Sequence, residues 1–111
     1  MQLEKHSKVI GVTFAEADGT KRQDNCRKVV EGQKLYVMLE KDNPFDPNAM
    51  KVFIDEQMTM PIGYIQRELA SDLQTQIAQH GWSYEFFADK LTGGSAGKSL
   101  GVNIRIVATK Q

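Results

Sequence analysis

The apolar residues of this chain fall into short runs, and clusters of Gly, Pro, Asn and Asp separate several of these runs. Six runs are rich in β-branched and aromatic residues, at 9–14, 35–40, 49–54, 61–65, 83–91 and 101–107. Their composition and length are typical of β-strands. Since only one other segment is long and periodic enough for a substantial helix, the sequence predicts a mostly-β protein.

The last of these runs shows most clearly how a strand would sit in the fold. Val102, Ile104 and Ile106 alternate along it with Asn103 and Arg105. Because successive side chains of a strand point to opposite faces of the sheet, this strand has one apolar and one polar face. We expect its three aliphatic side chains to lie in the core.

Two helices are expected. Residues 67–80 have the periodicity of an amphipathic helix, and Gly81 would end it. Its inner face would carry five apolar residues, Leu69, Ala70, Leu73, Ile77 and Ala78. A short helix is expected at about 21–30, because Thr20 and Gln23 have the spacing of a capping box. Its inner face would carry Cys26, Val29 and Val30.

These elements fit one domain over residues 1–111, since a typical domain has roughly 100–150 residues. The expected fold is a small OB-like antiparallel β-barrel of about six strands, with one longer and one short helix. A closed or nearly closed barrel of this kind leaves no long sheet edge exposed.

Charge and cysteine content limit the possible functions. The chain has 14 Lys and Arg against 14 Asp and Glu, so its formal net charge is zero. A long non-specific nucleic-acid groove needs a basic excess, whereas a pocket for one or two nucleotides does not. One cysteine, Cys26, and two distant histidines predict neither a disulfide nor a metal site. With no apolar run near the roughly 20 residues of a membrane span and no signal-peptide core, a cytoplasmic location is expected.

The glycine-rich loop at 92–100 contains Gly-Lys-Ser, the end of a phosphate-binding loop motif. Thr92 stands where that motif requires its first glycine, and both flanks have strand composition. A phosphate-binding loop instead leads from a strand into a helix. We therefore expect a flexible hairpin loop and no nucleotide cofactor. Local motifs suggest no set of acid, base and nucleophile, so we expect a binding module and not an enzyme.

The segment 42–49, with sequence DNPFDPNA, is the most informative one for function. Pro, Asn and Asp are common turn residues, and a turn alone would explain them. Phe45 is harder to explain, because a polar turn has no need of an aromatic ring. The ring either packs on the core or is presented for stacking on a nucleotide base. In the second case Asn43 or Asp46 would hydrogen-bond a sugar hydroxyl.

The chain resembles the HIRAN domain family in five segments that occur in the same order and cover nearly its whole length: GVTF at 11–14, EKDNPFDPNAMKV at 40–52, IGYIQRELA at 62–70, TGG at 92–94 and GVNIRI at 101–106. Members of this family occur alone in bacteria and phages, the type that this chain resembles. Others are fused to DNA-remodelling helicases, nucleases and ubiquitin ligases. The resemblance implies an OB-like barrel. By similarity to a well-understood eukaryotic member, it also implies capture of a single-stranded DNA 3′ end.

The resemblance further implies six DNA-binding residues, Phe14, Asn43, Phe45, Asp46, Tyr64 and Arg67. The two phenylalanines match aromatic residues that hold the terminal bases. Asp46 matches an acid that meets the 3′ hydroxyl, and Arg67 a basic residue that meets phosphate. Asn43 and Tyr64 match other positions of the same ligand-facing motifs. The eukaryotic member has an arginine in place of Thr13 and tyrosines in place of the phenylalanines, so weaker binding is expected here.

The sequence therefore predicts a DNA-binding module that recognises single-stranded DNA 3′ ends in DNA repair or replication-fork processing. The alternative is a protein-interaction module that docks onto a replication or repair helicase or nuclease, through the same loop or an exposed edge strand. The neutral net charge favours this alternative. The combination of aromatic, acidic and basic residues favours DNA binding.

Overall fold

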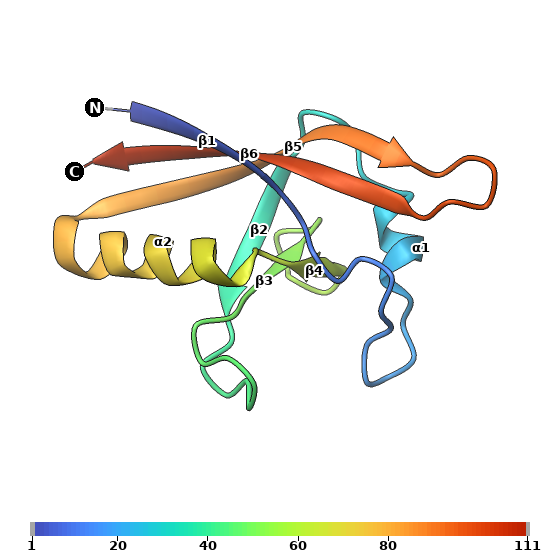
Figure 1. Ribbon diagram of the computed structural model, residues 1–111, viewed down its shortest axis with the longest axis horizontal. Helices are drawn as coiled ribbons and strands as arrows, with labels where there is room; N and C mark the ends of the chain where they lie inside the picture. Colours follow the sequence, from blue (N-terminus) through green and yellow to red (C-terminus); the bar gives the residue numbers. More distant parts are fainter. Residues whose placement is uncertain (1, 111) are drawn as a thin grey trace.

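The computed structural model of the protein describes residues 2–110 and shows six strands and two helices in this range. In chain order they are β1 (Gln2–Lys8), α1 (Arg22–Cys26), β2 (Lys34–Leu39), β3 (Met50–Phe53), β4 (Pro61–Tyr64), α2 (Arg67–His80), β5 (Trp82–Gly93) and β6 (Leu100–Lys110). The strands form one antiparallel sheet in the order β1-β6-β5-β2-β3-β4. The sheet curls into a half-barrel (Figure 1), which confirms the predicted mostly-β, OB-like fold.

The two edges of the sheet, β1 and β4, meet at a single point. Ile10, just after β1, exchanges both backbone hydrogen bonds with Tyr64 at the end of β4, each at 2.9 Å. Gly63 makes this approach possible. It has a φ of +150°, and a Cβ built on it would lie 2.3 Å from the Ile10 carbonyl oxygen. The half-barrel is therefore closed at a position that only glycine fits.

The core lies on the concave side of the sheet, as the alternating pattern of β6 predicts. Val102, Ile104 and Ile106 are all buried. The bounds of α2 agree with the predicted 67–80, and Gly81 ends the helix in the left-handed conformation. Ala70 and Leu73 of α2 are buried. The prediction that Ile77 and Ala78 also face the core is wrong, because only the first half of the helix packs against it.

The predicted strand at 9–14 is wrong. After Ile10 the chain turns, since Gly11 has a φ of +74° and its carbonyl accepts the Phe14 N–H at 3.2 Å. The first strand is instead β1, which pairs with β6 from Gln2 opposite Thr109 to Lys8 opposite Asn103. Nearly all side chains of β1 are exposed, so the strand has no apolar face that the sequence pattern could reveal.

The short helix is also shorter than predicted, because α1 spans only Arg22–Cys26. The predicted capping box is wrong: the residue before the helix is Lys21, without a side-chain cap. The Gln23 amide instead donates to the carbonyls of Val12 and Leu100 and accepts the Leu100 N–H, at 2.9 to 3.0 Å. These bonds tie α1 to the start of β6. Cys26 and Val29 are buried as predicted, and Val30 is exposed.

The three middle strands lie within two residues of their predicted bounds, whereas β5 and β6 are longer than expected. They are the two arms of a hairpin, so the predicted strand-to-strand context of the glycine-rich loop is confirmed. The start of β1 and the end of β6 lie side by side, on the opposite side of the molecule from the 40–48 loop (Figure 1). Within residues 2–110, neither helix has the length and apolar content to cross a membrane.

Replacing Gly63 with alanine should open the half-barrel. We expect Gly63→Ala to lower the free energy of unfolding by about 3 kcal/mol, because the new methyl group overlaps the Ile10 carbonyl. Gly32→Ala is the matched control, since Gly32 also has a positive φ but a Cβ there meets no atom within 4 Å. The control should lose only about 1 kcal/mol. Urea denaturation measures both, and equal losses would contradict the role of Gly63 in closure.

Candidate nucleic-acid interface

All six residues predicted to bind DNA line one groove, which has a volume of about 670 Å³. Three stretches of chain form its walls: the turn at 10–15, the loop at 43–49 and the junction at 64–67 between β4 and α2. The bridge between Ile10 and Tyr64 joins the first of these walls to the third. The six residues therefore share one surface although they are up to 53 positions apart in the sequence.

Both candidate stacking residues are exposed. Phe14 is 67% and Phe45 is 87% accessible to solvent, and both line the groove. Neither ring packs in the core, so the alternative that the Phe45 ring packs on the core is wrong. Large exposed apolar side chains that gather in a concave site are typical of ligand-binding surfaces.

Asn43 shapes the loop that carries Phe45. Its Oδ1 atom accepts the backbone N–H groups of Phe45 and Asp46, at 2.9 and 3.0 Å. Its Nδ2 atom donates to Glu40 at 3.1 Å. Asn43 thus lies in the groove lining, but its amide is occupied by bonds within the loop. This arrangement is an Asx turn, and it holds Phe45 in place without any contact of the ring with the core.

Asp46 has one carboxylate oxygen engaged in the loop and one directed to Arg67. Oδ1 accepts the Asn48 N–H at 2.9 Å. Oδ2 lies 3.9 Å from Nε of Arg67, whose side chain is 73% exposed. An ion pair this long, with one partner this exposed, contributes little stability. Arg67 is therefore available to a ligand at little cost, while the Asp46 side chain is only 18% exposed in the groove lining.

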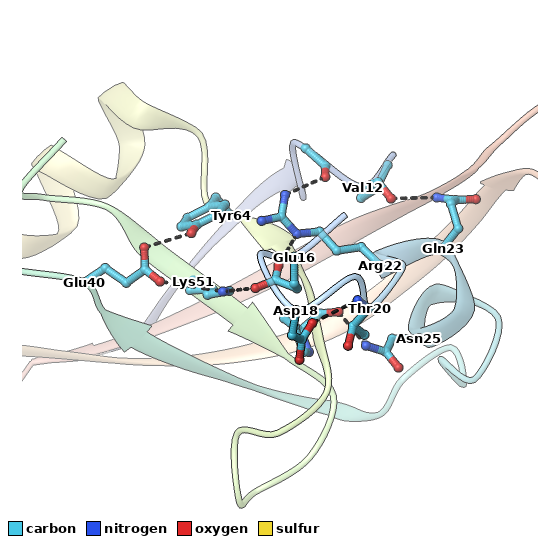
Figure 2. A network of polar contacts seen from close by, with 12 residues as sticks. Val12, Glu16, Asp18, Thr20, Arg22, Gln23, Asn25, Glu40, Lys51 and Tyr64 are labelled. Atoms are coloured by element: carbon cyan, nitrogen blue, oxygen red, sulfur yellow. Dashed lines mark hydrogen bonds and ion pairs between the residues drawn. The ribbon is translucent and has the colours of Figure 1, made fainter. Parts of the chain in front are cut away.

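Tyr64 lines the groove, while its hydroxyl bonds to a residue that is not part of the groove lining. The hydroxyl donates to Glu40 at 2.8 Å (Figure 2). Burial, together with this carboxylate, raises the pKa of Tyr64 to about 12. The hydroxyl is therefore uncharged at neutral pH. The Arg22 guanidinium lies 5.2 Å from the centre of the ring, a cation–π distance.

Next to the groove lies a group of charged residues that the sequence does not reveal, here called the ion cluster: Glu16, Arg22 and Lys51 (Figure 2). The Glu16 carboxylate accepts hydrogen bonds from Nε of Arg22, at 2.5 Å, and from Lys51. Burial acts to raise the pKa of Glu16, but these two cationic donors together hold it below its ordinary value. The partners of Glu16 are 6 and 35 residues away, so no local motif contains them.

Other chemistries find little support in the described residues. From 2 to 110 there is no group of three or more His, Cys, Asp and Glu side chains placed to hold a metal ion. Cys26 is buried, and burial raises the pKa of its thiol to about 11. A thiol with this pKa is uncharged at neutral pH and makes a poor nucleophile.

Comparisons with known proteins agree with this fold. The sequence matches the HIRAN domain family over residues 10–109. A crystal structure of a protein from Lactobacillus plantarum is similar, with a TM-score of 0.65 and 17% identity over 98% of this chain and 100% of that one. The HIRAN domain of human HLTF has a TM-score of 0.57 and 18% identity over 97% of this chain and 76% of that one. No curated protein sequence gives a significant match.

The two structural similarities establish the fold, and the family match covers nearly all of the sequence. HIRAN domains are binding modules, generally for nucleic acids. The half-barrel, the DNPFDPNA loop and the family match over residues 10–109 lead to one conclusion: the chain belongs to the HIRAN domain family.

Proposed function

We propose that this domain binds the 3′ end of single-stranded DNA in the groove described above. The observation that carries the proposal is the exposure of Phe14 and Phe45 in the same groove as the Asp46 carboxylate. Aromatic rings bind bases by stacking and accept any base, since every base has a π-face. A carboxylate that accepts a hydrogen bond from a terminal hydroxyl distinguishes a strand end from the interior of a strand.

In this mechanism the terminal bases stack on the two rings, and the 3′ hydroxyl donates to Oδ2 of Asp46. Arg67, 3.9 Å from that oxygen, is released from Asp46 and is then free to meet a phosphate. The ligand contacts few phosphates, which fits a chain with no net charge. Single-stranded DNA ends arise in DNA repair and at replication forks, and a helicase or nuclease acting there is the kind of protein that this domain would serve. The chain would act as one binding module without catalysis of its own.

The preference for a free 3′ hydroxyl is the first test. We expect a fluorescent single strand with a 3′ hydroxyl to bind at least tenfold more tightly than the same strand with a 3′ phosphate, because the phosphate would repel Asp46. Asp46→Asn should reduce this ratio to near one, while it keeps the acceptor for the Asn48 N–H. Fluorescence anisotropy measures all four affinities. Equal binding of the two strands by the native protein would rule out end recognition.

The second test addresses stacking. Phe45→Ala should weaken binding by about 1–3 kcal/mol, the usual range for one aromatic ring under a base. The ring is 87% exposed, so its loss should leave the unfolding temperature unchanged. Val30→Ala, which removes another exposed apolar side chain away from the groove, is the control and should bind normally. Unaltered DNA affinity of Phe45→Ala would show that the ring has another purpose, such as docking of a protein.

A further inference from the structure

Arg22 lies in the lining of the groove although its side chain is only 10% exposed. Its Nε atom donates to Glu16 at 2.5 Å, and its Nη1 atom donates to the Gly11 carbonyl at 2.9 Å. A guanidinium has five N–H donors, so these bonds use only two of them. Within residues 2–110, Nη2 has no hydrogen-bond partner.

The Nη2 group of Arg22, which carries the unused donors, is not fully buried. No fully buried side-chain nitrogen or oxygen in the described part of the chain lacks a partner, so Nη2 must be accessible. Figure 2 shows the guanidinium directed toward Tyr64, another residue of the groove lining. A nearly buried cation thus presents hydrogen-bond donors to the site, and the residues behind it hold these donors in a fixed orientation.

Arg22 is also coupled to Phe14 through one backbone group. The Gly11 carbonyl accepts both the Arg22 Nη1 donor and the Phe14 N–H. A Cβ built on Gly11 would lie 3.2 Å from Nη1 of Arg22 and 3.6 Å from Cδ2 of Phe14. The guanidinium edge and the ring therefore both border this one residue, so the Arg22 donors lie next to the candidate stacking ring.

The charge balance of the groove supports an anionic ligand at this point. Its charged lining residues are two arginines, Arg22 and Arg67, and one carboxylate, Asp46, whereas Glu16, the partner of Arg22, lies outside the lining. Glu16 divides its carboxylate between Arg22 and Lys51, and Lys51 also lies 3.7 Å from the carboxylate of Glu40. Glu16 and Lys51 line a separate cavity of about 420 Å³, whereas Arg22 lines the groove, so Arg22 is the cation of the ion cluster that a ligand in the groove can reach.

We propose that Arg22 binds a phosphodiester group of the DNA strand directly, beside the base stacked on Phe14. This inference rests on the proposed function and deepens it, because the ligand must then contain an internal phosphodiester and extend over at least two nucleotides. Arg22 is the principal phosphate contact and Arg67 a secondary one. Arg67 is 73% exposed and loses side-chain freedom when it binds, whereas Arg22 is already held by its neighbours.

The first test of this phosphate contact removes single charges from the ligand and leaves Arg22 unchanged. Single strands with a free 3′ hydroxyl carry one uncharged methylphosphonate, placed at the first, second or third linkage from the 3′ end. We expect one position to weaken binding by roughly ten- to hundredfold, since hydrogen bonds to a charged group are the strong ones. The same position should weaken binding to Arg67→Lys by the same factor.

The corresponding variant is Arg22→Lys, which keeps the charge but loses the planar donor set. It should bind the natural strand weakly. A methylphosphonate at the position that weakens binding to the native protein should have little further effect on this variant. Arg105→Lys is the control, because Arg105 lies on β6, is paired with Glu4 and is not part of the groove lining. Thermal unfolding of each variant shows whether the fold is retained. If Arg22→Lys does not fold, the native protein and Arg67→Lys decide the question through the linkage series.

The outcomes separate the two proposals. Binding of every methylphosphonate strand as tightly as the natural strand overturns the assignment of Arg22 but leaves end binding intact. Full linkage sensitivity in folded Arg22→Lys, or its loss in Arg67→Lys, also overturns it. If the native protein binds none of the strands, the proposed function fails together with this inference.

Discussion

The reciprocal hydrogen bonds between Ile10 and Tyr64 join the two edges of the curled sheet, and the site depends on this junction. The turn that carries Phe14 begins directly after Ile10, and the junction that leads to Arg67 begins directly after Tyr64. Closing the sheet therefore brings two walls of the groove together in one step. The absence of a side chain at Gly63 is the condition for this approach. A single residue without a functional group thus determines whether the functional groups meet.

The ion cluster also connects the elements next to the groove. Glu16 belongs to the loop before α1, Arg22 to α1 and Lys51 to β3, so one carboxylate connects three elements. Buried ion pairs of this kind add little net stability, because desolvation offsets most of the attraction. Their effect is on geometry, since a buried charge tolerates few alternative arrangements. In this domain that geometry includes the orientation of the Arg22 guanidinium.

Sequence patterns predict those helices and strands whose bounds depend on residues within or next to the element itself. The bounds of α2 follow from Leu69, Leu73 and the left-handed Gly81, all of them local features. The strand β1 escapes prediction because its stability comes from pairing with β6 and not from an apolar face.

The prediction of a strand at 9–14 is wrong for the opposite reason, because these residues have the apolar pattern of a strand but do not form one. Its residues are apolar because they line the core and the groove, although Gly11 turns the backbone away from the sheet. Family motifs predicted the six candidate residues of the groove, whereas they did not predict Arg22. Its place in the groove lining depends on contacts with Glu16 and Gly11 that exist only in the folded chain.

The pairing of β1 with β6 has a consequence for how this domain can be combined with others. Gln2 lies opposite Thr109, so the two ends of the fold are about one strand spacing, roughly 5 Å, apart. Both ends leave the molecule on the side away from the 40–48 loop (Figure 1). A unit with adjacent ends can be inserted between two consecutive residues of a host protein with little distortion of the host. The same geometry would let a tether at either end carry the domain with the 40–48 loop away from the tether.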